Sequence, residues 1–441
     1  MSLYPLLLST MLLGATPLPH FPVEQYQLDN GLTVILAEDD RLPVVAVEVR
    51  YLVGSGNEKP GRTGFAHLFE HLMFQGTAGY DQEYFAPFEP IGGAVNGTTS
   101  VDRTNFYERV PSNYLELSLW MESDRMEEFL PVLTQDKLNN QRDVVLNERR
   151  QSYVDEPYGM VWQYLAEALW PPGHPYHHTT IGDPKDIENA TLEDVRAFYQ
   201  RYYVPANAVL TIVGDFEPDE TKRLVRTYFG HLAGGNRAPV PQGALPKITK
   251  SVHIRQTDDV KLPRLYLAWP TPALYAAGDA ELDVISNVLS RGKTSRLFQP
   301  LVYEKKVAKD VEAFQASQML GSYFVVMVTA APGTTIDELY QETMQALRDA
   351  LAKPPTPAEL DAAVNYFKKG YYSRMEGVVE RAGLFSTYYH HTGKADYLAE
   401  DIQRYTQATP DGVQAVAQRW LDLDHFVRVD IVPGVKAGGA E

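Results

Sequence analysis

The sequence predicts an α+β protein made of two homologous domains in tandem. Runs of β-branched residues typical of strands alternate with amphipathic runs typical of helices, and this alternation starts again after residue 250. A repeat links the two halves: residues 191–202 and 409–420 share Thr, Val, Ala, Gln and Arg without gaps, at a constant offset of 218. Because a strand-like run follows each copy, both halves are expected to end in the same helix-then-strand unit.

Length, charge and cysteine content exclude several classes of protein. The chain has 441 residues, enough for two or more domains, and its hydrophobic content of 44% is ordinary for a soluble globular protein. Its net charge of −17 disfavours nucleic acid and anionic membranes as partners, because both repel an acidic surface. The chain has no cysteine, which excludes disulfides, thiolate catalysis and zinc sites built from cysteine.

The N-terminal stretch has the length of a secretory signal but lacks its usual positive charge. Residues 3–15 are mostly apolar and too few to span a membrane. We predict that residues 1–20 are a signal peptide, or otherwise an apolar arm that packs on the body. A signal peptide implies a periplasmic or secreted protein. An uncleaved arm would instead fit a cytoplasmic protein, which is the alternative. No later segment has about 18 uncharged apolar residues in a row, so no membrane span is expected.

Residues 21–229 are predicted to form the first domain. An Asn-Gly turn between two strand-like runs predicts a hairpin at residues 25–37, and β-branched residues predict a strand at 44–53. Apolar periodicity predicts helices at residues 112–129, 134–154 and 191–203. A continuous apolar run predicts a buried strand at residues 208–214.

Residues 91–107 are strand-like but small and polar, so they would make a weak core element. We expect them at a sheet edge, where the backbone can pair with an extended peptide, although a plain edge strand or loop is the alternative. The candidate peptide-binding residues are Ala94, Val95, Asn96, Gly97 and Thr98.

Glycine and proline mark residues 230–250 as a linker, and residues 251–441 are predicted to form the second domain. Its expected strands are at residues 251–254, 264–268, 323–330 and 426–432, and its expected helices at 280–289, 334–353 and 356–374. The offset of 218 places Ile285, Val288 and Leu289 at the positions that correspond to His67, Glu70 and His71 of the first domain. These three residues are apolar, so the second domain is expected to lack metal ligands.

The stretch from residue 64 to residue 74 contains His67-x-x-Glu70-His71 on a predicted helix. Two imidazoles four residues apart lie about 40° apart around a helix and can hold a divalent metal, most often zinc. Glu70 lies on the same face, where a carboxylate could take a proton from a metal-bound water. The alternative is a pair of histidines on a buried helix. A second cluster, with three histidines within residues 174–178, could bind metal, but its Pro and Gly favour a fixed turn.

These residues resemble the M16 family of zinc peptidases, the inverted-zincin group that includes mitochondrial processing peptidase, pitrilysin and insulin-degrading enzyme. The stretch from His67 to Phe74 resembles the family signature, and the resemblance extends over nearly the whole chain. In that family a glutamate about 77 residues beyond the second histidine is the third zinc ligand. The resemblance therefore implies that Glu148 completes a zinc site with His67 and His71.

The resemblance also implies a fold and an activity. The fold would be two α/β-sandwich domains, forming half of a clam-shaped dimer around a chamber, as in the M16B branch. The activity would be that of a zinc metalloendopeptidase with one Zn²⁺ per chain, a peptide substrate held extended on the edge strand, and Glu70 as general base on zinc-bound water. Mn²⁺ or Co²⁺ could also occupy such a site. The alternatives are a non-catalytic structural or assembly subunit and a processing peptidase dedicated to one small peptide.

Two departures from the family pattern bear on that activity. Gln141 stands where many members carry a second glutamate. Active members also carry an Arg and a Tyr in the second domain, whereas here only Tyr303 and Lys309 fall near the expected places. We therefore hypothesise that a second M16-like subunit supplies the Arg and Tyr in a heterodimer. A homodimer is the alternative.

Overall fold

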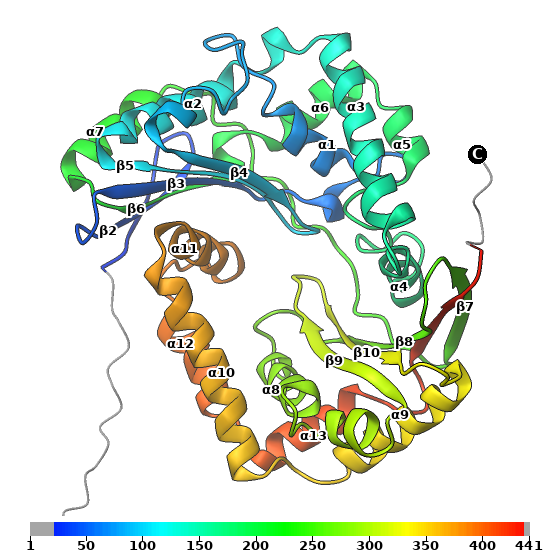
Figure 1. Cartoon of the computed structure of the whole chain (residues 1–441). Helices are drawn as coiled ribbons and strands as arrows, with labels where there is room; N and C mark the ends of the chain where they lie inside the picture. The colour runs from blue at the N-terminus through cyan, green and yellow to red at the C-terminus, as the bar shows by residue number, and fades with distance from the viewer. Residues whose placement is uncertain (1–21, 436–441) are drawn as a thin grey trace, which may run out of the picture.

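The computed structural model describes residues 22–435, so the apolar stretch at residues 1–20 lies outside the described part of the chain. Two β-sheets, each covered by helices, confirm the predicted α+β class and its two similar halves (Figure 1). One half lies above the other in this view, with most helices on the outer faces of the two sheets. Within residues 22–435, no helix has the length and apolar character needed to cross a membrane.

The first sheet has six strands in the order β1-β2-β6-β3-β5-β4, and only β2 and β6 run parallel. Its strands are β1 Glu24–Gln27, β2 Thr33–Glu38, β3 Val44–Tyr51, β4 Ala94–Thr99, β5 Thr104–Pro111 and β6 Ala208–Gly214. The helices of this half are α1 Phe65–Leu72, α2 Leu115–Glu127, α3 Gln135–Arg149, α4 Val161–Leu169, α5 Pro184–Glu188, α6 Leu192–Tyr202 and α7 Pro218–Phe229. The β-branched strands β3 and β6 lie in the buried centre, and the small, polar β4 lies at an open edge.

The second sheet has five strands in the order β7-β11-β8-β10-β9, and only β7 and β11 run parallel. Its strands are β7 Val252–Asp258, β8 Arg264–Thr271, β9 Ala308–Ala316, β10 Ser322–Ala330 and β11 Val427–Pro433. The helices of this half are α8 Asp279–Ser290, α9 Ile336–Leu351, α10 Pro357–Glu376, α11 Val378–Thr392, α12 Leu398–Thr406 and α13 Pro410–Trp420. Residues 231–251, between α7 and β7, form neither helix nor strand.

The two halves share one topology. The order β2-β6-β3-β5-β4 in the first sheet corresponds to β7-β11-β8-β10-β9 in the second, and the single parallel pair has the same place in both. The repeated sequence forms α6 and α13, and each of these helices leads into the last strand of its half, β6 or β11, which belongs to the parallel pair. In the first half, α7 then follows β6, so only the second half ends in the predicted helix-then-strand unit. The residues that correspond to the histidine motif lie in α8 and are buried apolar side chains, as the repeat predicted: Ile285, Val288 and Leu289.

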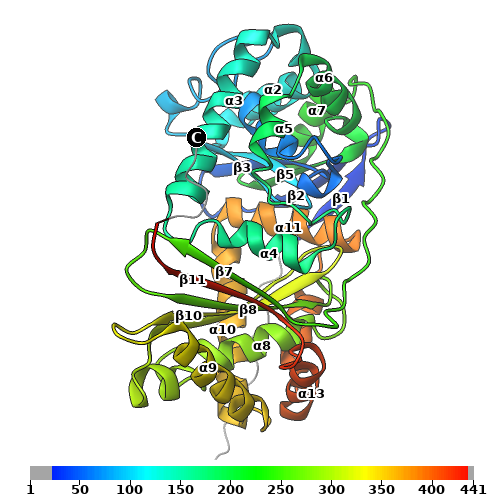
Figure 2. The ribbon, with the colours of Figure 1, turned by 90° about the vertical axis from the view of Figure 1, so that its right-hand side faces the viewer.

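Each half contributes a helix to the sheet of the other half. From the first half, α4 packs Leu165 and Leu169 into a cluster with Tyr266 and Val427 of the second sheet. From the second half, α11 packs Phe385 and Tyr388 against β2, β3 and β6. Figure 2 shows α11 beneath the first sheet and α4 above the second. The halves are therefore interlocked, and the sequence did not predict either helix.

The sequence analysis also did not predict β9, α5, α7 or α12, and two of the elements that it predicted end or divide differently. The helix expected at residues 134–154 ends as α3 at Arg149, and a π-helical turn, Arg150–Asp155, follows it. The strand expected at residues 91–107 divides into β4 and the start of β5, because the chain turns back at residues 100–103. This hairpin exposes only β4 at the sheet edge.

Candidate metal centre and peptide-binding edge

The histidine motif lies on α1, which buries one apolar face in the first core. Phe65, Leu68 and Leu72 are buried, and this packing directs the opposite face away from the core. The helix begins after Gly64, whose φ of +83° is a left-handed conformation that favours glycine. A Cβ at Gly64 would also come within 2.6 Å of Ile187, so glycine is needed here both for its backbone angle and for its small size.

Glu58 supplies the N-terminal cap that Gly64 cannot provide. Its fully buried carboxylate accepts hydrogen bonds from the backbone nitrogens of Gly64 at 2.8 Å and Ala66 at 2.7 Å. Free N–H groups at a buried helix start are costly, and a carboxylate also interacts favourably with the positive end of the helix dipole. Glu58 therefore fixes the start of the helix that carries both histidines.

We expect Glu58→Ala to lower the free energy of unfolding by about 2–4 kcal/mol, because it leaves two helix N–H groups buried without acceptors. Urea denaturation of the full chain measures this loss. Glu58→Gln keeps the size of the side chain and one acceptor oxygen, so its loss should be smaller. A Glu58→Ala chain as stable as the wild type would rule out the capping role.

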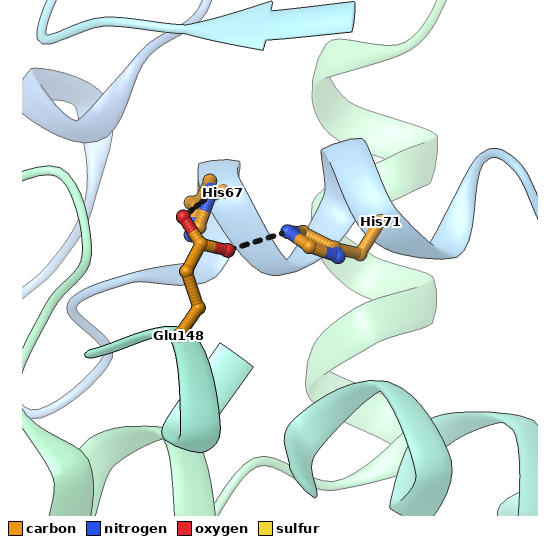
Figure 3. Close-up of side chains that lie close together, drawn as sticks. All are labelled: His67, His71 and Glu148. Carbon is orange, nitrogen blue, oxygen red and sulfur yellow. Dashed lines mark ion pairs between the residues drawn. The ribbon is translucent and has the colours of Figure 1, made fainter. Parts of the chain in front are cut away.

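Three potential metal ligands converge between α1 and α3. The Nε2 atoms of His67 and His71 lie 3.6 Å and 3.2 Å from the two carboxylate oxygens of Glu148, which stands in the last turn of α3. Figure 3 shows the carboxylate reaching from its own helix toward both imidazoles. One ligand atom from each residue lies within 4.8 Å of the others, and residues 22–435 contain no second group of three potential ligands of this kind.

The geometry and protonation of these side chains fit a zinc ion. Bonds of about 2.0–2.1 Å in a tetrahedral site place ligand atoms about 3.4 Å apart, close to the two separations between the histidines and Glu148. Burial lowers the pKa of His67 to about 4, which leaves its imidazole neutral at neutral pH, as metal binding requires. The hydrogen bond with His71 lowers the pKa of Glu148, which favours the ionised carboxylate.

Glu70 stands on α1 beside the two histidines and is linked to the edge strand. Its carboxylate accepts a hydrogen bond from the hydroxyl of Thr99, the last residue of β4. Burial raises the pKa of Glu70 above the usual carboxyl value, which suits a group that must accept a proton near neutral pH. Thr99 was not among the residues predicted from the sequence.

The hydrogen-bond pattern of β4 determines which of its groups face the open edge. The Ser100 nitrogen donates to the Arg103 carbonyl across the turn, and antiparallel pairs alternate from that point along the strand. This alternation turns the backbone groups of Val95, Gly97 and Thr99 outward. Consistently, the Gly97 nitrogen donates to the Asn96 side chain at 2.9 Å rather than to β5. Ala94, Asn96 and Thr98 are thus the members of the strand that pair with β5.

Gly97 gives Glu70 the room it occupies. A Cβ at this position would lie 3.2 Å from Cγ of Glu70 and 3.1–3.2 Å from the rings of Phe106 and Phe74. The absence of a side chain thus lets α1 approach the edge strand closely enough for the bond between Glu70 and Thr99.

For the general base that the sequence predicts at Glu70, we expect Gly97→Val to lower kcat/KM by about 10²-fold, because a displacement of roughly 1 Å at a reacting group has an effect of this size. The measurement is steady-state hydrolysis of an unstructured peptide, with the zinc content of the same samples. Ala94→Val is the matched control, since Ala94 lies on the same strand but is exposed. Equal activity of the two variants would contradict the role of Gly97 in the close approach of α1 to β4.

The other residues considered from the sequence lie outside this cluster. Gln141 is buried on α3, where its amide donates to Asn140 at 2.9 Å. Tyr303 is 69% exposed, and Lys309 is exposed on β9. Residues 174–178 form a turn, in which the His177 nitrogen donates to the His174 carbonyl, as the Pro and Gly of this stretch favoured. The side chain of His174 stacks on Trp170, and the ring of His177 bonds to the Trp170 carbonyl.

Comparison with known proteins matches two related family models to successive parts of the chain. The model of Insulinase (Peptidase family M16) matches residues 33–181, and the model of the Peptidase M16 inactive domain matches residues 189–367. All three potential metal ligands and Glu70 lie in the first match. The match described as inactive lies beyond them.

Individual relatives extend the similarity over most of the chain. The chain is 31% identical to the zinc protease PqqE of Helicobacter pylori over 392 residues, which cover 87% of this chain and 85% of that one. It is 26% identical to the "Probable mitochondrial-processing peptidase subunit beta" of Schizosaccharomyces pombe, covering 75% and 74% of the two chains. The crystal structure of a protease from Helicobacter pylori superimposes with a TM-score of 0.87 at 28% identity, over 94% of this chain and 100% of that chain.

Proposed function

Because the chain belongs to peptidase family M16, we propose that it is a zinc-dependent endopeptidase that hydrolyses peptides or unfolded segments held extended along β4. One observation carries this proposal. Glu70 lies on the same helix as His67 and His71 and bonds to the edge strand through Thr99. The candidate base, the candidate metal ligands and the edge that can pair with a peptide therefore lie next to one another.

Each residue has a distinct role in the proposed reaction. His67, His71 and Glu148 would hold one Zn²⁺, which when bound polarises the scissile carbonyl and lowers the pKa of water toward about 7. Glu70 accepts the proton of the attacking water and passes it to the leaving amine. The outward-facing backbone groups of Val95, Gly97 and Thr99 pair with the peptide, as an added strand would.

The test is hydrolysis of an unfolded protein and of the same protein in its folded form by the purified chain, with and without a chelator. We expect internal cleavage of the unfolded form, identified by mass spectrometry, and its loss on chelation and return with Zn²⁺. A chain that binds zinc but cleaves nothing, alone or with a partner, would instead support the non-catalytic subunit. Cleavage of a single small peptide would support the dedicated processing enzyme.

We further propose that the active enzyme is a heterodimer. The second half offers only an exposed Tyr303 and Lys309 where active relatives carry an Arg and a Tyr, and one relative is by name a subunit. A second M16-like chain with that pair would complete the site. Co-purification and mixing experiments test this proposal: the partner should raise kcat/KM, whereas full activity of a homodimer would contradict it.

The proposed location is the periplasm or the outside of the cell. It rests on the apolar stretch at residues 1–20, which has the length of a signal peptide. Cell fractionation with N-terminal sequencing of the recovered protein tests it, and an uncleaved chain in the cytoplasm would contradict it.

A further inference from the structure

The edge strand β4 has little packing of its own to hold it in place. Its residues are small or polar apart from Val95, which packs against the first core, and the strand pairs with β5 on one side only. Gly97, in its middle, contributes no side chain. A strand of this kind is intrinsically weak, yet the bond between Thr99 and Glu70 requires it to stay at a fixed distance from α1. Side-chain contacts that hold this strand therefore add to its pairing with β5 in fixing its position.

Arg103 provides such contacts from the hairpin turn. Its Nη1 donates to the Thr98 carbonyl at 2.6 Å and to Oδ1 of Asn105 at 2.7 Å. The Thr98 hydroxyl donates to the same Asn105 oxygen at 2.6 Å. Because Thr98 and Thr99 are adjacent, a shift of Thr98 would also move the hydroxyl that binds Glu70.

The same contacts continue from Asn105 to the second half of the chain. One carboxylate oxygen of Glu48, on β3, accepts hydrogen bonds from Nδ2 of Asn105 at 3.0 Å, from Nε of Arg50 at 3.3 Å and from the Ser386 hydroxyl at 2.9 Å. Ser386 belongs to α11, and Arg50 donates a further bond to the Gly383 carbonyl of that helix at 3.2 Å.

These contacts form one continuous network, buried around Glu48 and part-buried at Thr98 and Arg103. Glu48 is 1% exposed and Ser386 is fully buried, so the side chain of Glu48 depends on the three surrounding donors for its hydrogen bonds. Hydrogen bonds to a buried charge are strong, and removing one partner leaves a costly unsatisfied group. The network is therefore rigid enough to transmit position from α11 to β4.

We propose, on the basis of the peptidase function above, that Arg103 and Ser386 are positioning residues for the peptide-binding edge. Through α11, the half without metal ligands sets the position of β4 relative to Glu70. The contact of α11 with the first half thus affects the position of the peptide relative to Glu70. It does so within one chain and does not depend on a partner subunit.

Amide hydrogen exchange of the full-length chain tests this proposal without any need for activity. We expect Ser386→Ala to speed exchange in β4 about tenfold while α1 is unchanged, since one hydrogen bond to a buried charge is lost. Thr387→Ala is the matched control, because the neighbouring hydroxyl bonds only to the Gly383 carbonyl of its own helix. Unchanged exchange in β4 of the Ser386→Ala chain would overturn the proposal.

Kinetics separate positioning from simple loss of stability. Ser386→Ala and Arg103→Gln should lower kcat/KM for an unstructured peptide about tenfold, with the zinc content unchanged. Arg103→Lys, which keeps the charge, should recover part of the effect. Losses of kcat/KM no larger than that of Thr387→Ala would refute the proposal. If neither the wild type nor any variant cleaves peptide, the hydrogen-exchange data still decide whether the positioning proposal holds.

Discussion

Glu70→Gln is expected to lower kcat by about 10²–10⁴-fold while the chain retains its zinc, because general base catalysis contributes an effect of this size. The amide has nearly the same shape as the carboxylate and can still accept the hydrogen bond from Thr99, so α1 and the edge strand should stay in place. What is lost is a group that can take a proton from water. Steady-state hydrolysis of a peptide, combined with metal analysis of the same samples, measures both properties.

Thr99→Val is the informative companion of Glu70→Gln. It keeps the carboxylate but removes the hydroxyl that orients it, so a loss of only about tenfold is expected. If Glu70→Gln retained most of its activity, the base would have to be another group. If it lost its zinc as well, its inactivity would say nothing about proton transfer.

The local sequence pattern predicted those elements whose character depends on their own residues. β6 has the predicted bounds, Ala208–Gly214, because a run of β-branched residues buried on both faces is unambiguous. The pattern failed for α4 and α11. Their buried residues, such as Leu165 and Phe385, pack on the sheet of the opposite half, and local periodicity cannot identify a packing partner so distant in sequence.

The same distinction applies to the site. The spacing of His67 and His71 is sufficient to place both imidazoles on one face of a helix. Glu148 stands on another helix, so only the resemblance to a family pointed to it, and the packing of α1 against α3 brings it within 3.2 Å of His71. The register of β4 could not be known in advance, which is why Thr99 was missed and the outward-facing members of the strand were not distinguished.

Removal of a single candidate ligand should have the second large effect. We expect His67→Ala and Glu148→Gln to lose zinc on dialysis and, with it, all peptide cleavage, because the remaining two side chains cannot hold the ion tightly. His231→Ala is the matched control, since this exposed histidine bonds to Glu127 and takes no part in the cluster. Metal analysis after dialysis distinguishes the two ligand variants, which should lose zinc, from the control, which should keep it.

Stability provides a readout of the same site that does not depend on catalysis. A ligand that binds only the folded state stabilises it by about 2.7 kcal/mol when present at 100 times its Kd. Urea unfolding with and without Zn²⁺ should therefore show this gain for the wild type and for His231→Ala, and none for His67→Ala or Glu148→Gln. An equal gain in all four proteins would place the metal elsewhere. No gain in the wild type would mean that the three side chains converge without binding zinc, and that the proposed peptidase activity has no metal centre.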